Sequence, residues 1–86
     1  MNDTLWMLQG RYEYLPIVPA DVVARDFFDL DRRTFLRKVD GGDIKLPLIQ
    51  MERSQKSQKG VHIRDLAKYI DCMHAEARRQ MELTHS

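Results

Sequence analysis

The order of apolar and polar residues along the chain changes its period several times, and each change marks an expected element. Residues 4–12 begin with a candidate N-cap threonine and four consecutive apolar side chains, and Gly10 then interrupts the run. A short helix or a strand would fit this segment; we favour the helix, with Trp6 in the core. Residues 14–18 should be extended, because Pro16 removes a backbone donor and disfavours helix in the residue before it.

Residues 19–28 and 32–40 are predicted to form two helices joined by a turn of about three residues. Pro19 fits the first helical position, where its missing N–H costs nothing. Asp31 is a favourable N-cap for the second helix, and the Gly-Gly pair at 41–42 ends it, because glycine readily adopts the left-handed conformation that follows helix C-termini. This order is typical of a helix-turn-helix. The first helix should turn one side to the core: Val23, Ala24, Phe27 and Phe28.

The second helix separates an apolar side from a basic side. At 100° per residue, Phe35, Leu36 and Val39 share one arc. The opposite arc holds Arg33, Thr34, Arg37 and Lys38. One side is therefore expected to pack against the core, and the other to be strongly basic.

Residues 44–63 are expected to form a β-hairpin. Apolar residues alternate over 44–48, a polar segment follows at 53–60 (RSQKSQKG), and an apolar piece resumes at 61–63. A strand, a basic loop and a second strand are typical of the wing of a winged helix. The polar side chains at its tip are Arg53, Gln55, Lys56, Gln58 and Lys59.

Residues 65–83 are predicted to form a C-terminal helix. Its apolar stripe follows helical spacing at Leu66, Ala67, Ile70, Met73, Ala77 and Met81. The stripe is longer than a small core can cover. The half after Met73 is therefore either a frayed polar tail or a helix that binds a partner.

Together these elements predict one α+β domain over residues 1–86, a small winged helix-turn-helix with a two-stranded wing and a C-terminal helix. A chain of 86 residues buries only about 60% or slightly more of the surface that its unfolded form exposes. That leaves little room for an enclosed substrate pocket and excludes a large multi-substrate enzyme.

The formal net charge of +1 conceals an uneven distribution. Residues 31–64 carry nine basic and four acidic side chains, a net of +5, and the rest of the chain carries five basic and nine acidic ones, a net of −4. A basic middle between acidic flanks can attract a polyanion to one face of the molecule. A solvated stretch of mixed charge is the alternative interpretation.

Signals for catalysis, metals, cofactors and membranes are weak. His62, His74 and His85 do not fall at metal-ligand spacing, and no Walker A or GxGxxG motif is present. A lone Cys72 fits a reducing cytoplasm. No stretch approaches the roughly 18 apolar residues of a membrane helix. We therefore expect a cytoplasmic, nucleoid-associated protein that is not an enzyme and has no cofactor, no metal and no membrane partner.

The basic helix and the basic loop fit one mode of docking on double-stranded DNA, with the second helix in the major groove and the wing on phosphates or in the minor groove. Arg33 and Arg37, one turn apart, could each contact a guanine through two hydrogen bonds, with Thr34 and Lys38 beside them. In the loop, the lysines 56 and 59 suit phosphates, and the glutamines 55 and 58 suit backbone or base edges.

Three stretches resemble a known family: IVPADVVARDFF, FLRKVDGGDIKLPLIQME and SQKSQKGVHIRDLAKYID. They are similar to the pyocin activator family, PrtN-type transcriptional activators of bacteriophage-like tailocin clusters, over about residues 5–71. More distantly, the order of elements resembles AlpA-type regulators and phage excisionases, whose winged-helix fold is related to the MerR DNA-binding domain.

The resemblance implies sequence-specific DNA binding near phage or bacteriocin promoters. By position, it assigns Arg32, Arg33, Thr34, Arg37 and Lys38 to the recognition helix and residues 53–59 to the wing. Analogy with small excisionase-like proteins also suggests self-association on tandem sites.

Three functions compete at this point. The first is a transcriptional activator of bacteriocin or prophage genes, which would also contact RNA polymerase. The second is an excisionase-like directionality factor that binds and bends attachment-site DNA and would contact an integrase. The third is a protein-binding module such as an antirepressor, suggested by the long C-terminal stripe.

Overall fold

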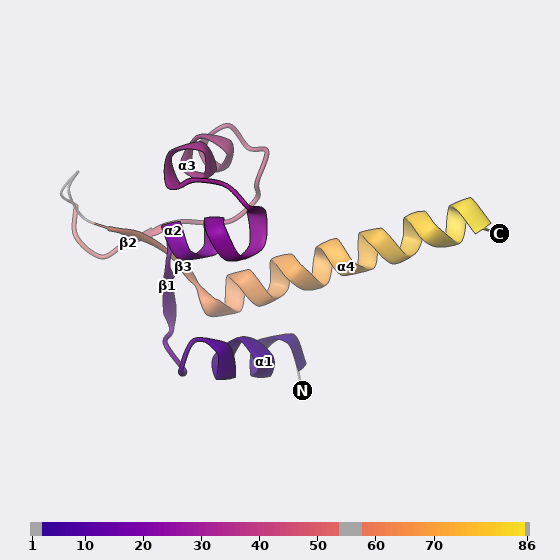
Figure 1. Cartoon of the computed structure of the whole chain (residues 1–86), viewed down its shortest axis with the longest axis horizontal. Coiled ribbons are helices and arrows are strands. Elements are labelled where there is room, and N and C mark those ends of the chain that lie inside the picture. The colour runs from indigo at the N-terminus through magenta and orange to yellow at the C-terminus, as the bar shows by residue number, and fades with distance from the viewer. Residues whose placement is uncertain (1–2, 54–57, 86) are drawn as a thin grey trace.

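The computed structural model describes residues 3–53 and 58–85, and all structural statements below concern these ranges. Over them the chain is an α+β fold with an antiparallel sheet, compatible with a winged-helix arrangement (Figure 1). The elements in chain order are α1 (Asp3–Arg11), β1 (Ile17–Pro19), α2 (Ala20–Val23), the π-helical segment η1 (Ala24–Phe28), α3 (Arg32–Asp40), β2 (Ile49–Gln50), β3 (Lys59–His62) and α4 (Ile63–His85).

The sheet has the strand order β1-β3-β2, so that β3 is hydrogen-bonded on both sides. Val18 of β1 lies opposite Val61, and Gly60 lies opposite Pro19 on one side and Ile49 on the other. A Cβ atom at Gly60 would lie 2.5 Å from Cγ2 of Ile17 and 3.1 Å from the carbonyl oxygen of Val18. The close approach of β1 to β3 therefore depends on a residue without a side chain.

The hairpin expected over residues 44–63 is shorter than predicted, and the predicted two-stranded wing is part of a larger sheet. Residues 44–48 form no strand, although Ile44 and Leu46 are buried. The backbone N–H of Ile44 donates to the carbonyl of Lys38 (3.1 Å), so this stretch is still tied to the end of α3. Over the described ranges β1 adds a third strand, which the sequence suggested only as an extended piece.

The core lies between α2, α3, the sheet and the first half of α4. Phe35 of α3 is fully buried, and the ring of Phe28 lies between it and Tyr69 of α4, with centroid distances of 5.3 Å and 5.7 Å. Among the described residues no polar side chain is buried. The buried residues are Leu8, Val18, Ala20, Val23, Ala24, Phe35, Ile44, Leu46, Val61, Ile63, Leu66 and Ala67.

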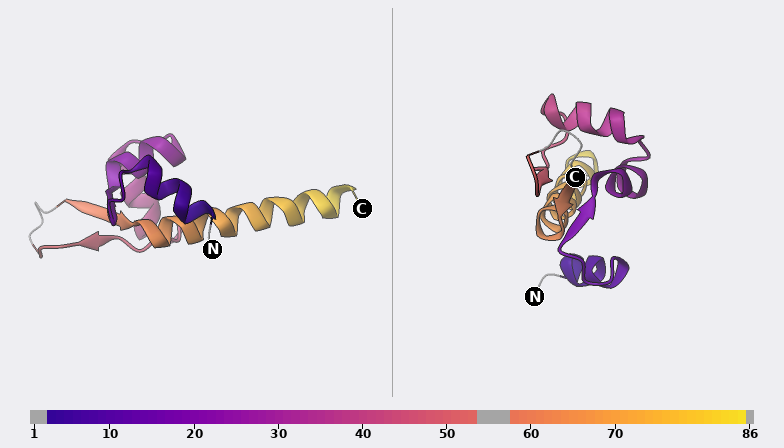
Figure 2. Two further views of the ribbon diagram at one scale, coloured as in Figure 1. Left: turned by 90° about the horizontal axis from the view of Figure 1, so that it is seen from below. Right: turned by 90° about the vertical axis from the view of Figure 1, so that its left-hand side faces the viewer.

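Helix α1 lies along the side of α4 away from α3 (Figures 1 and 2). Leu8 is buried against the core, and the hydroxyl of Thr4 donates to Oδ1 of Asp71 at 2.5 Å. The prediction that Trp6 belongs to the core was wrong, because 64% of this residue is exposed. Trp6 precedes Leu8 by two positions, about 200° around a helix, so it points away from the packed side.

The predicted helix over residues 19–28 is divided between α2 and the wider turn of η1. Pro19 is the last residue of β1 and the N-cap of α2 rather than a helical residue. The backbone N–H groups of residues 29 and 30 both donate to the carbonyl of Ala24, the former across the five-residue span of a π-helix. The wider turn keeps Phe28 half-buried on the core while Phe27, expected on the same side, is 39% exposed.

Helix α4 continues far beyond the body of the molecule (Figures 1 and 2), whose longest dimension is 51 Å. Leu66 and Ala67, in its first turns, are fully buried. From residue 72 to residue 84 every side chain except the half-buried Glu76 is exposed. This half is helical rather than a frayed tail; that it binds a partner stays a prediction.

Candidate nucleic-acid interface

The turn between η1 and α3 is held by local hydrogen bonds. Asp29 ends η1 in the left-handed conformation with φ 53°, and the N–H of Leu30 donates to the carbonyl of Ala24 at 3.1 Å. Asp31 then caps α3, because its Oδ1 accepts the backbone N–H of Thr34 at 2.7 Å. The start of α3 is therefore fixed relative to η1.

The Asp31 carboxylate is stabilised in its charged form. Hydrogen bonds from the side chain and the backbone of Thr34 hold the pKa of Asp31 below its usual value, with a smaller contribution from the positive charges of Arg33 and Arg37. The cap and the basic side of α3 thus support each other electrostatically.

The arginines of α3 are the most accessible of its predicted DNA-binding residues. Arg32, Arg33 and Arg37 are exposed, and Phe35 on the other side is fully buried. Thr34 and Lys38 are only half-buried rather than on a fully exposed arc. Lys38 follows Phe35 by three residues and so lies about 60° from it around the helix, at the edge of the packed side.

The C-terminus of α3 is fixed by the loop that leads to the sheet. Gly41 follows the helix, and Gly42 adopts φ +85°, a conformation that side chains disfavour. The carbonyl of Lys38 accepts N–H groups from Asp43 (2.9 Å) and Ile44 (3.1 Å). Both ends of α3 are therefore anchored by specific hydrogen bonds, which suits a helix that presents side chains to a ligand.

The described part of the hairpin carries three of its predicted contact residues. Arg53 and Gln58 are exposed, and Lys59, opposite Gln50 in the sheet, is half-buried. Gln55 and Lys56 lie outside the described residues. The hairpin and α3 both belong to the end of the molecule opposite the C-terminus of α4 (Figures 1 and 2).

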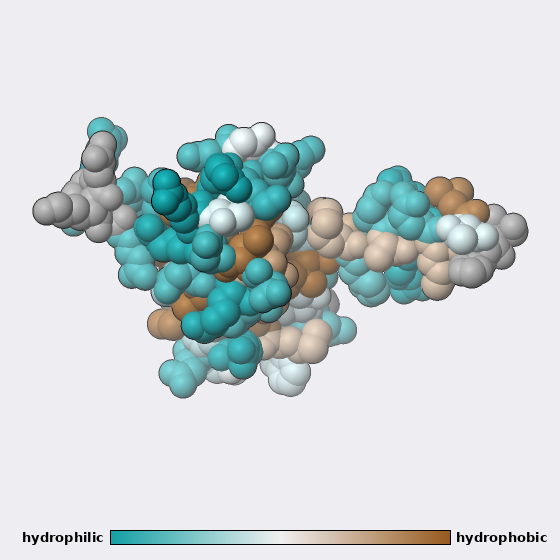
Figure 3. All heavy atoms as spheres, turned by 45° about the horizontal axis from the view of Figure 1, so that its top comes forward, coloured by the Kyte–Doolittle hydropathy of each residue, from teal (hydrophilic) through white to brown (hydrophobic). Residues whose placement is uncertain are grey.

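The surface over this end is largely hydrophilic. Figure 3 shows hydrophilic side chains gathered on the upper face of the body, on the side of α3 and towards the hairpin, with smaller apolar areas between them. Such a face is compatible with a charged, hydrated partner.

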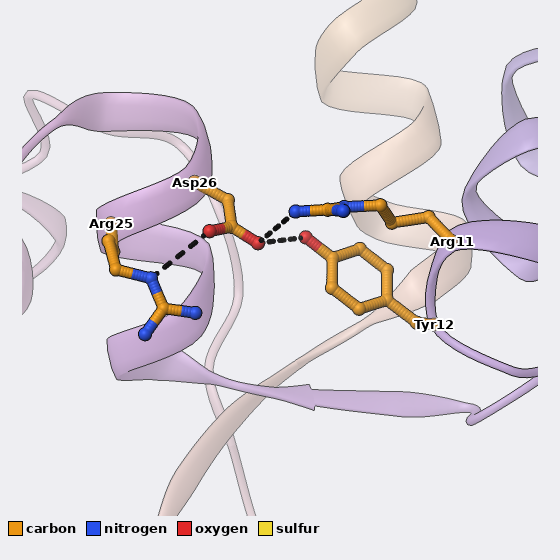
Figure 4. A network of polar contacts seen from close by, with 4 residues as sticks. All are labelled: Arg11, Tyr12, Arg25 and Asp26. Carbon is orange, nitrogen blue, oxygen red and sulfur yellow. Dashed lines mark hydrogen bonds and ion pairs between the residues drawn. The ribbon is translucent and has the colours of Figure 1, made fainter.

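A polar network that sequence patterns did not indicate fastens the first helix of the helix-turn-helix to the end of α1 (Figure 4). The hydroxyl of Tyr12 donates to Oδ2 of Asp26 at 2.7 Å, which also lies 3.4 Å from the guanidinium of Arg11. Nε of Arg25 contacts the other carboxylate oxygen at 3.2 Å. The hydrogen bond from Tyr12 is the largest influence that lowers the pKa of Asp26. These residues are 14 or 15 positions apart, so no local spacing could have paired them.

Two kinds of site were searched for in the part of the chain that the structure describes. Within residues 3–53 and 58–85, no three His, Cys, Asp or Glu side chains come together as they would to hold a metal ion. Within the same ranges, no helix is long and apolar enough to span a membrane.

Comparison with known proteins gives one match. No curated protein and no solved structure matches the chain. A family model described as Pyocin activator protein PrtN matches residues 4–77, from α1 to the middle of α4, and so covers the helix-turn-helix, the sheet and the core. The expected resemblance is thereby confirmed: the chain belongs to the pyocin activator protein PrtN family, a family of regulatory proteins.

Proposed function

We propose that this protein is a sequence-specific DNA-binding activator of bacteriocin or prophage genes, with α3 as its recognition helix and the β2–β3 hairpin as its wing. Membership of the PrtN family supports the regulatory role. The single observation that carries the DNA-binding role is the exposure of Arg32, Arg33 and Arg37 on a helix whose other side is anchored by Phe35.

The spacing of the arginines suits base recognition. Arg33 and Arg37 are four residues apart, about 6 Å along the helix axis. Base pairs are stacked about 3.4 Å apart. The two guanidinium groups would therefore reach guanines about two base pairs apart, each through two hydrogen bonds to O6 and N7.

The remaining polar residues have a different role in this proposal. Arg32, at the first position of α3, and Arg53, Gln58 and Lys59 of the hairpin would contact phosphates and set the position of α3 in the groove. We assign Gln55 and Lys56 to the same role from the sequence pattern alone. Thr34 and Lys38, half-buried at the edges of α3, would contribute less than the exposed arginines.

The test is a footprint followed by quantitative binding. The protein should protect repeated boxes upstream of bacteriocin or prophage promoters, and protection confined to a phage attachment site would instead assign it to directionality control of recombination. On the protected sequence, Arg33→Ala and Arg37→Ala should each weaken binding by about 1–3 kcal/mol and relax the preference at one base pair.

The matched control is Lys68→Ala, which removes one positive charge from an exposed position on α4. This variant should bind almost as the parent protein does and keep the full base preference. If the arginine variants lose no more affinity than Lys68→Ala, or keep activating the promoter in cells, α3 is not the recognition helix and the protein acts through a protein partner.

A further inference from the structure

We propose that a second copy of this chain docks antiparallel on the projecting half of α4, residues 72–84, and so forms a dimer without DNA. Nothing in the assignment of α3 to DNA requires this contact. It rests on the apolar side chains of this half, on a groove at its base and on the order of its charges.

The projecting half exposes large apolar side chains. Met73 is 49% exposed, Met81 55% and Leu83 69%. Leu83 lies outside the stripe that continues from the core, because it follows Met73 by ten residues and is displaced by about 80° around the helix. Its exposure therefore has no explanation in the packing of α4 on its own body.

A groove opens where α4 leaves the body. It has a volume of about 530 Å³ and lies between the loop after α3, including Pro47, and the side of α4 that carries Tyr69, Cys72 and Met73. Leu83 follows Cys72 by eleven residues, which is almost three whole turns, so the two lie within about 20° of each other around α4. The groove and Leu83 are thus on the same side of the helix, about 16 Å apart along its axis.

One two-fold axis between residues 77 and 78 matches these features to each other. An antiparallel partner related by this axis brings its Leu83 level with Cys72 and into the groove, and its Met81 beside Met73. The same axis places Glu76 level with the partner's Arg79. The apolar and the charged positions therefore fit a single register.

Charge order favours this pairing. In the monomer Glu76 is ion-paired with Arg79 of its own helix, and both lie on the flank that carries Leu83. Reversal of the partner helix sets each acid beside the partner's base, so two ion pairs can be shared across the contact. Arg78 and Ala75 lie on the far side of the helix, so no like charges are forced together.

The size of the contact predicts its strength. The overlap spans about twelve residues, or 18 Å of helix. This falls short of the roughly 1,200 Å² that stable complexes bury, so the dimer should be weak, with a dissociation constant of roughly 10 μM to 1 mM. The two bodies would then lie at opposite ends of the helix pair.

Sedimentation of the full chain without DNA, over the range of about 10 μM to 1 mM, tests the proposal. Leu83→Glu should weaken association by roughly tenfold or more, because it removes an apolar contact and puts a charge into the groove. The matched control, Ala75→Glu, adds the same charge to the opposite side and should dimerise as the parent does, with the same helical circular dichroism. A parent chain that stays monomeric at about 1 mM, or equal weakening by both variants, would refute the proposal.

The single cysteine tests the orientation. In the antiparallel register the two Cys72 residues are about 16 Å apart along the axis, beyond the roughly 7 Å that a disulfide spans between Cα atoms. Leu83→Cys should therefore give, with an added oxidant, a covalent dimer linked between positions 72 and 83, which peptide mapping identifies. A link between two Cys72 residues in the parent protein would instead show parallel helices and overturn the register.

Discussion

Gly60 is the position where one added methyl group should have the largest structural effect on the sheet. Replacing it with alanine puts a Cβ atom 2.5 Å from Cγ2 of Ile17 and 3.1 Å from the carbonyl oxygen of Val18. The backbone oxygen cannot move without shifting β1, and β1 is followed directly by the buried α2. Overpacking of this kind costs about 1–3 kcal/mol. Gly60→Ala should therefore lower the free energy of unfolding by that amount, measured by urea denaturation with far-ultraviolet circular dichroism.

Two further variants separate overpacking from a general effect of glycine replacement. Gly10→Ala, in α1 with no atom within 4 Å of the added Cβ, should stabilise the protein by about 0.5–1 kcal/mol. Ile17→Ala removes the Cγ2 atom and should make Gly60→Ala less costly in the double variant than in the parent. A Gly60→Ala protein as stable as the parent, or a double variant in which the two costs simply add, would show that the contact with Ile17 is not what requires glycine.

Two other substitutions test the anchoring of α3. Phe35→Ala, at a fully buried position, should cost about 3–5 kcal/mol of the roughly 4–13 kcal/mol expected for 86 residues, and calorimetry should show a much lower melting temperature than for Phe35→Leu; similar melting temperatures would contradict the central place of this ring. Asp31→Ala should lower the urea midpoint at pH 7, where the carboxylate is charged. Because the pKa of Asp31 is lowered in the folded state, its contribution is present above the unfolded value of about 4 and is lost as the pH falls through the folded pKa, so the midpoints of parent and variant should converge at low pH. A difference that stays constant down to pH 2 would contradict this role.

Local signals in the sequence were enough to predict α3. The cap at Asp31, the apolar positions around Phe35 and the glycines after Asp40 all depend on residues within one helix, and the structure places the helix at the expected bounds. The identity of the family was likewise accessible, because the stretches that carry it are continuous in sequence.

The features that sequence patterns missed depend on long-range contacts. The pairing of β1 with β3 joins residues more than forty positions apart, and the carboxylate of Asp26 meets Tyr12 only once α1 has docked. The exposure of Trp6 has the same origin, since an apolar segment does not reveal which of its residues will face the neighbouring helix. For Phe27 the cause is different: a helical period of 3.6 residues was assumed where the chain takes the wider turn of η1.

That wider turn determines the phase of everything that follows it. A π-helical turn contains one residue more than the α-helical turn it replaces. A chain that lost one residue from Ala24–Phe28 would regain a regular helix but would enter α3 rotated by about 100° relative to the sheet. The side chains of Arg33 and Arg37 would then be aimed differently from an unchanged α3 sequence. Relatives that differ by one residue in this segment would therefore be expected to prefer different DNA sequences, even where their recognition helices are identical.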